Sequence, residues 1–392
     1  MKLNWKWLLL GAALALVFFY IGKGYGGPVQ ARQLSGANSV SEPTGVSASA
    51  ADVVSEATSA AAESAPDAVS EATTDSVSVP GVISDVISAA STVIGSWQTG
   101  AEGVSAGNAR YSFDKGITRV DVPEGTESIS IANTNGKIEM KQGNGKDIEI
   151  HTTVVVNQAT AEEARTIADK AGVKVSGGAQ LEIKTYSEPY GNIHYPGLEL
   201  TVTLPKGMKA DLQAKTKNGN LSLSDVSSTG KIKLSSVNGN VTASGPPKDI
   251  SLHTVNGNVE VSEAKANVDI SLTNGNVKAE QIAGTLVAET TNGNLTVKDA
   301  LAAIEAVTVA GNIHVESRRV GGDWRVTSTV GDVELAWPEN AGVVVDAKSA
   351  LGEMDTDFPL TVKNHKISGK IGEGTYQIHA QSMAGLSLMR KK

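Results

Sequence analysis

Two small groups of charged residues are the best candidates for chemistry in this chain. Asp355 and Asp357 are two residues apart, so their carboxylate oxygens could hold a hard cation. Two carboxylates are too few for calcium, which takes about six to eight oxygen ligands. Arg318, Arg319 and Asp323 come nearest to the clustered Asp, Lys and Arg of a polysaccharide lyase. Neither group is sufficient, and the sequence predicts no catalytic, cofactor-binding or metal-binding residue.

The other reactive residue types and motifs give no site. The histidines lack the mutual spacing of ligands, and we interpret them as surface or turn residues: His151, His194, His253, His314, His365 and His379. Cysteine is absent, which excludes a thiolate metal site and a cysteine nucleophile. P-loops, dinucleotide fingerprints, nucleophile elbows and the Gly-Gly-x-Gly-x-Asp repeats of calcium-binding solenoids are absent too. We therefore predict a protein that is not an enzyme and needs no cofactor.

A repeated Asn-Gly-Asn motif organises the middle of the chain. Its glycines lie at positions 219, 239, 257, 275 and 293, and a weaker copy, Ala310-Gly311-Asn312, follows. The period is 20 residues once and 18 residues thereafter. Self-similarity at a fixed period predicts an architecture of stacked repeats. In such a stack the two Asn columns would form amide ladders, which we favour over a ligand-binding role for them.

Apolar residues recur at fixed offsets from each repeat glycine. Ile250 and Leu252 precede Gly257, whereas Val259 and Val261 follow it, and the other repeats keep this alternation. Each repeat is therefore predicted to be two short strands joined by an Asn-Gly turn. The same template fits the chain around Gly136, Gly331 and Gly352.

Two architectures fit this pattern. Asn-Gly between alternating strands is also typical of hairpins. Hairpins would need a second tight turn in every repeat, but the other connections vary, from Ser244–Pro247 in one repeat to Glu263–Ala266 in the next. We therefore predict an all-β, single-stranded β-solenoid with coils of about 18–20 residues, in which like positions stack about 4.8 Å apart.

The alternation also predicts which residues face outward. The position three residues before the glycine holds a hydroxyl residue in most repeats and is predicted to point into the core, which disfavours a flat ice-binding threonine array: Thr216, Ser236, Thr254, Thr290, Thr308, Ser328 and Ser349. The outer strand positions have mixed charge without a cluster: Lys233, Ser251, Asp269, Glu289, Glu305 and Arg325. The outer positions therefore do not provide the clustered carboxylates that a lyase would need in one groove.

The chain before the repeats has a different composition. Residues 1–24 hold an apolar run long enough for a transmembrane helix, and we predict an uncleaved signal anchor; cleavage near Arg32 is the rival interpretation. Residues 25–79 are predicted to be a disordered acidic tether rich in Ala and Ser. Residues 80–98 have an apolar stripe at helical spacing and are predicted to form an amphipathic helix.

The remaining residues, 109–392, are predicted to form the β-solenoid domain. Between Gly136 and Gly219 lies one longer insertion, in which Thr160 and Glu163 form a capping box that predicts a small helix from Thr160 to Ala171. The formal net charge is −8, with an excess of four basic residues in 1–32 and nine acids without Lys or Arg in 33–108. The solenoid is thus nearly neutral and offers no basic face for nucleic acid.

Several local motifs in the solenoid region match a known pattern. They are Ile129 to Met140 with its Asn-Gly turn, the strand Leu198 to Leu204 before Pro205-Lys206-Gly207, Val326 to Pro338 with its Gly-Asp turn, Asp355 to Pro359, and Gly369 to Gly374. With these motifs the chain resembles the bacterial "putative adhesin" family of β-strand-repeat domains, a domain of unknown function. The resemblance covers about residues 110–390 and departs where Leu386 and Leu388 lie one position off the coil template.

The resemblance implies a β-helix-like domain, often displayed from a membrane anchor, without assigned catalytic residues. We therefore expect a membrane-tethered cell-envelope module for binding, adhesion or scaffolding. Its expected partners are the inner membrane, through the N-terminal helix, and an envelope protein or polysaccharide. The expected location is the bacterial cell membrane, crossed once, with the C-terminal domain in the periplasm or outside the cell. An envelope polysaccharide-active enzyme on a β-helix and a sensory ectodomain remain alternatives.

Overall fold

The computed structural model describes residues 100–101, 110–191, 194–227 and 230–391. The predicted signal anchor, acidic tether and amphipathic helix, residues 1–24, 25–79 and 80–98, lie outside the described residues. Within the described part, no helix is long and apolar enough to cross a membrane. The described residues from 110 onward belong to the predicted solenoid domain.

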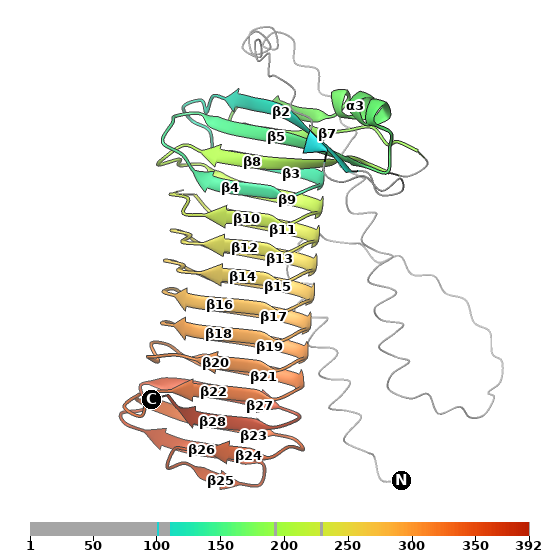
Figure 1. Cartoon of the computed structure of the whole chain (residues 1–392). Coiled ribbons are helices and arrows are strands. Elements are labelled where there is room, and N and C mark those ends of the chain that lie inside the picture. The colour runs from blue at the N-terminus through green and yellow to red at the C-terminus, as the bar shows by residue number, and fades with distance from the viewer. Residues whose placement is uncertain (1–99, 102–109, 192–193, 228–229, 392) are drawn as a thin grey trace, which may run out of the picture. The chain divides into compact units, whose positions relative to one another are not determined.

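The domain consists of two 14-stranded sheets, here called sheet A and sheet B, and each coil contributes one strand to each sheet (Figure 1). The regular coils are β9 (Asp211–Asn218) with β10 (Leu221–Ser224), β11 (Ile232–Asn238) with β12 (Val241–Ser244), β13 (Ile250–Asn256) with β14 (Val259–Ser262), β15 (Val268–Asn274) with β16 (Val277–Ile282), β17 (Leu286–Asn292) with β18 (Leu295–Ala300), β19 (Ile304–Ala310) with β20 (Ile313–Glu316), and β21 (Trp324–Val330) with β22 (Val333–Trp337). The odd-numbered strands of this set lie in sheet B and the even-numbered ones in sheet A.

Neighbouring coils pair in parallel and in register. Ile232 pairs with Ile250 and Asn238 with Asn256, so each position meets the equivalent position of the next coil. A hairpin array would pair β11 with β12 in antiparallel fashion, whereas these strands belong to different sheets. The predicted β-solenoid is therefore confirmed.

The core is the space between the two sheets, and it is filled by the inward-facing alternate residues. Leu252 and Val261 are fully buried, at 0% exposure, on the two sides of one coil. Burying such side chains contributes about 1.5–3 kcal/mol each relative to exposing them. Near the C-terminal end the core contains Trp324 and Trp337, whose rings meet edge to face at 6.1 Å. Trp337 also stacks on Phe358 at 4.5 Å.

Glycine is needed in the repeated turn because successive turns stack backbone on backbone. Gly257 has a φ of +152°, and a Cβ atom there would overlap the carbonyl oxygen of Gly239. That oxygen accepts a 2.9 Å hydrogen bond from the Thr254 hydroxyl. Thr254 is fully buried, and the same inward position holds the buried hydroxyls of Thr308 and Ser328. The prediction that this column of hydroxyl residues points into the core is confirmed.

The first coil is not at the N-terminal end of the stack. It consists of β3 (Ser128–Asn135) and β4 (Ile138–Gln142) and lies between β9–β10 and a later coil, β7 (Gln180–Tyr186) with β8 (Gly197–Leu204). Antiparallel strands complete this end: β1 (Gly100–Ala101), β2 (Arg110–Val120) and β5 (Ile148–Asn157) in sheet A, and β6 (Gly172–Ser176) in sheet B.

The inserted helix, α3 (Ala161–Asp169), covers this end of sheet A. The Thr160 hydroxyl accepts a 3.3 Å hydrogen bond from the backbone N–H of Glu163, and the Glu163 carboxylate accepts a 2.9 Å hydrogen bond from the N–H of Thr160. Ala164 and Ala168 are buried against Val154 and Val156 of β5. The predicted capping box and the helix that it begins are confirmed.

The last coil is inserted in the same manner at the other end. β27 (Tyr376–Ser382) and β28 (Leu386–Arg390) lie between the coil β21–β22 and the earlier coil β23 (Val343–Ser349) with β24 (Met354–Thr356). The hairpin β25 (Thr361–Lys363) and β26 (Lys366–Ile371) then pairs antiparallel with β23. Leu386 and Leu388 pair with Val333 and Leu335 and are buried, because the turn before β28 is one residue shorter than the template.

Candidate functional site

The first Asn column of the repeated turn is a continuous ladder of side-chain amides. Nδ2 of Asn256 donates to Oδ1 of Asn238 at 2.9 Å, and Nδ2 of Asn274 donates to Oδ1 of Asn256 at the same distance. The ladder includes Asn135, Asn218 and Asn292. An amide in this column uses both a donor and an acceptor on its own neighbours, which favours the structural interpretation of the column.

The second Asn column uses its side chains differently. Oδ1 of Asn258 accepts a 2.9 Å hydrogen bond from the backbone N–H of Asn276, and the column repeats this contact up to Asn312. At the end of the column Asp332 takes the same place, donating its N–H to Asn312 and accepting at Oδ1 from the N–H of Gly385 at 2.7 Å. A carboxylate can stand here because only an acceptor is required.

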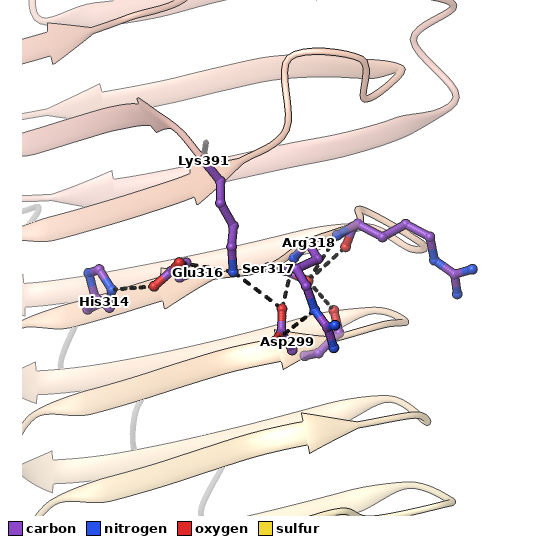
Figure 2. Close-up of polar contacts among 8 residues, drawn as sticks. Asp299, His314, Glu316, Ser317, Arg318 and Lys391 are labelled. Carbon is purple, nitrogen blue, oxygen red and sulfur yellow. Dashed lines mark hydrogen bonds and ion pairs between the residues drawn. The ribbon is translucent and has the colours of Figure 1, made fainter.

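A network of charged side chains surrounds Lys391 near the end of the chain (Figure 2). Its ammonium lies 2.9 Å from Oε1 of Glu316 and 3.4 Å from Oδ1 of Asp299. Nε of Arg318 lies 2.9 Å from the other oxygen of Asp299. His314 extends the network, with Nε2 at 3.9 Å from Oε2 of Glu316. Each acid therefore has a cation beside it.

The carboxylates of this network are not tuned for proton transfer. Burial raises the pKa of Asp299, but hydrogen bonds from Arg318 and the charge of Lys391 outweigh it and hold this pKa below its ordinary value. The hydrogen bond from Lys391 likewise lowers the pKa of Glu316. A general acid at neutral pH needs a pKa near 7, and both of these shifts go the other way. The arrangement suits an ion-pair network that fastens the C-terminus to β18 and β20.

The structure separates the trio of Arg318, Arg319 and Asp323. Arg318 pairs with Asp299, whereas the Arg319 guanidinium donates to the Leu301 carbonyl at 3.4 Å. The Asp323 carboxylate accepts a 2.8 Å hydrogen bond from the N–H of Gln377. These residues therefore form no common site.

Asp355 and Asp357 are also engaged separately by the backbone. Oδ1 of Asp355 accepts from the N–H of Thr356 at 2.8 Å, and Oδ2 of Asp357 accepts from the N–H of Arg390 at 3.0 Å. Among the described residues, no group of three or more His, Cys, Asp or Glu side chains is arranged to hold a metal ion.

The histidines are distributed over different parts of the domain. His151 bonds to Asp114 at 2.8 Å, His314 lies 3.3 Å from Glu334, and His379 contacts Gln381 at 2.9 Å. His194 is exposed near Tyr190, and His365 lies in an exposed turn with a φ of +56°.

The outer face of sheet B carries two regular rows of side chains, one residue per strand. The first row reads Glu182, Ser130, Gln213, Lys233, Ser251, Asp269, Val287, Glu305 and Arg325 from β7 to β21. The second row reads Lys184, Ala132, Lys215, Ser235, His253, Ser271, Glu289, Val307 and Thr327. All six residues predicted to be outer strand positions lie in these two rows: Glu289 belongs to the second row, and the other five belong to the first.

An open groove of about 800 Å³ crosses this face over β3, β9, β11, β13, β15 and β17. Short side chains such as Ser130 and Ser251 leave the space, and Lys233 and Asp269 line it. Burial and the charge of Lys233 lower the pKa of His253. Burial, Glu305 and Asp269 raise the pKa of Glu289. Sequence reasoning missed the groove and Lys391 because both depend on which coils are neighbours, and no local motif signals that.

Comparison with solved structures finds bacterial chains with limited similarity. A "putative adhesin" from Bacteroides fragilis is 11% identical and aligns with 71% of this chain and 98% of its own, with a TM-score of 0.33. A "putative lipid binding protein" from Parabacteroides distasonis is 11% identical over the same shares, with a TM-score of 0.34. At these scores the similarity does not bear on function. No curated protein matches the chain. The family model Toastrack DUF4097 matches residues 126–385, and the chain belongs to that family.

Proposed function

We propose that this chain is a membrane-tethered, non-catalytic binding module of the bacterial cell envelope. In this proposal residues 1–24 anchor the chain in the inner membrane, and the solenoid meets an envelope protein or polysaccharide in the periplasm or outside the cell. The apolar run at the N-terminus supports the anchor.

The observation that carries the binding role is the row structure of the outer faces. Like positions of successive coils stack in register, so each row presents one side chain about every 4.8 Å. A partner lying along the stack would make many similar contacts, none of which dominates the binding free energy. An extended polymer or an elongated protein surface fits such a face.

The proposal is tested by co-sedimentation of the full chain with isolated envelope fragments. Single changes such as Lys233→Ala or Glu289→Ala are expected to weaken binding by less than about threefold, because each removes one contact of many. Two block variants follow one row over four adjacent coils, with alanine at Thr242, Glu260, Lys278 and Thr296 on sheet A, or at Gln213, Lys233, Ser251 and Asp269 on sheet B.

At least one block is expected to weaken binding about tenfold or more. The proposal is wrong if neither block has an effect. It is equally wrong if the full chain cleaves an envelope polysaccharide and one carboxylate substitution abolishes that cleavage.

A further inference from the structure

The charges on the two sheet faces are handled differently. On sheet A, Lys278 lies 2.9 Å from Glu260 on the neighbouring strand and 3.4 Å from Glu280 on its own. On the two rows of sheet B, the charged side chains from β9 to β21 make no ion pair or side-chain hydrogen bond to any described residue: Lys215, Lys233, Asp269, Glu289, Glu305 and Arg325. The outer face of sheet B thus keeps charges that the chain itself does not neutralise.

These charges are ordered about strand β13. One strand away on either side, Lys233 on β11 is matched by Asp269 on β15 in the first row. Two strands away, Lys215 on β9 is matched by Glu289 on β17 in the second row. Four strands away, Glu182 on β7 is matched by Arg325 on β21, and Glu182 also forms an ion pair of 2.7 Å with Lys184 of its own strand. Each match joins opposite charges at equal distances from β13.

We infer that the outer face of sheet B is an interface with a second copy of this chain, related by a two-fold axis along strand β13. Such an axis turns the stack around, keeps each row facing its own row, and brings β11 of one copy over β15 of the other. Isologous interfaces require this kind of self-complementary surface.

The neutral positions agree with this pairing. Ala132 would meet Val307 of the partner subunit, and Ser235 would meet Ser271 of the partner subunit, so no charge in the two rows faces a like charge. On the axis Ser251 and His253 meet their own copies. At the edge of the face Asp249 meets its own copy too, but its carboxylate already accepts a hydrogen bond from the N–H of Asn267 at 3.2 Å.

The size of the face is sufficient for a stable dimer. The strands from β7 to β21 are stacked in one direction (Figure 1) and span about 38 Å at a spacing of about 4.8 Å. A seven-residue strand such as β13 is about 23 Å long at about 3.3 Å per residue. The product, about 870 Å², is close to the roughly 800 Å² that each partner of a standard interface buries.

The groove gives the long side chains of a partner room to enter. It lies over β3 to β17, so the strand pairs β11 with β15 and β9 with β17 fall within it. The inference goes beyond the proposed envelope binding, because it concerns self-association. It leaves the outer faces of sheet A in both copies open to another partner.

Because the chain has no cysteine, cross-linking can test the axis in membranes of cells that express the full chain. Ser251→Cys is expected to be linked to its own copy by a short bismaleimide, because sheets that pack face to face lie about 10 Å apart, beyond the reach of a direct disulfide. Differently tagged chains that carry Ser235→Cys and Ser271→Cys are expected to cross-link to each other. Thr242→Cys on the outer face of sheet A is the matched control and is expected to remain monomeric. A monomeric Ser251→Cys chain, or equal cross-linking of Thr242→Cys, overturns the inference.

A charge swap tests the pairing itself in the Ser251→Cys chain. Lys233→Asp and Asp269→Lys are each expected to reduce the cross-linked fraction about tenfold, because each places like charges opposite one another. The double variant is expected to restore cross-linking to within about twofold. The reversed sheet A pair Glu260→Lys and Lys278→Glu serves as control and is expected to change nothing. Unchanged cross-linking in the single variants, or no recovery in the double variant, contradicts the pairing. Neither result depends on an envelope ligand.

Discussion

The two asparagines of the repeated turn are the same residue type in two different roles. The first column needs a donor and an acceptor on each side chain, since Nδ2 of Asn256 donates to Asn238 and its Oδ1 accepts from Asn274. The second column needs only the acceptor, as Asp332 demonstrates at the end of that column. The two asparagines of one motif therefore differ in the hydrogen bonds that their side chains must make.

Substituting each column by aspartate separates the two roles. Asn256→Asp removes the donor and places a carboxylate against Oδ1 of Asn238, so we expect a loss of about 1–2 kcal/mol in the free energy of unfolding. Asn258→Asp keeps its acceptor, and we expect a loss below about 0.5 kcal/mol. Urea unfolding at pH 7 measures both variants. Equal losses would contradict the assignment of the two columns.

The repeated turn requires glycine for two reasons: the backbones of successive turns approach closely, and φ of a glycine such as Gly257 is positive. Gly257→Val would press a branched side chain into the carbonyl of Gly239, and we expect it to lower the free energy of unfolding by at least about 1–3 kcal/mol. A Cβ atom at Gly178 would meet no other atom within 4 Å, and its φ lies outside the left-handed region, so Gly178→Val is the matched control. Thermal unfolding should separate the two; an unchanged melting temperature for Gly257→Val would show that the turn assignment is wrong.

At the scale of the element, the last coil is held between two other coils near the C-terminal end of the sheets. β27 pairs with β21 on one side and with β23 on the other. Lys391, just beyond β28, then crosses to Asp299 and Glu316 on earlier coils. Arg390 adds an ion pair of 3.0 Å with Glu339. The last coil thus fills the position between the coils β21–β22 and β23–β24.

The ion pairs of Lys391 predict a pH-dependent contribution to stability. The pKa values of Asp299 and Glu316 lie below their ordinary values of 3.8 and 4.5 in the folded chain. A lowered carboxyl pKa stabilises the fold above the ordinary value, and this stabilisation is lost as the pH falls through the folded-state value. Lys391→Met is therefore expected to cost about 1–2 kcal/mol at pH 7 and progressively less as the pH falls below 4.5.

Urea unfolding between pH 7 and pH 3 checks this difference. Lys363→Met is the control, because Lys363 is exposed and makes no ion pair with the described residues. A Lys391→Met deficit that is independent of pH would mean that the lysine acts through packing and not through the two carboxylates.

At the scale of the whole molecule, the predicted anchor determines where the solenoid is displayed. Burial of an apolar helix in a bilayer does not depend on ionic strength, so the full chain is expected to stay in the membrane pellet after a high-salt wash. A peripheral protein bound by charge would be released by the same wash. Immunoblotting of the fractions measures the distribution, and soluble protein whose N-terminus lies near Arg32 would establish cleavage instead.

The sequence by itself determined the regular part of this protein. The 18-residue period fixed the coil, because equal spacing lets equivalent residues pair in register. Alternation around each glycine fixed which residues face the core, including Thr254 and Leu252. Helix α3 was also predictable, since the contacts that begin it, between Thr160 and Glu163, are local.

Only the tertiary structure decided the order of the coils and the composition of the surfaces. The first and last coils pair with strands on both sides out of chain order, and alternation looks the same wherever a strand is inserted. The place of Lys391 beside Asp299 follows from that insertion. The charge symmetry about β13 likewise arises from residues on separate coils, and a register error of one residue would turn side chains such as Glu289 from the outer face to the core.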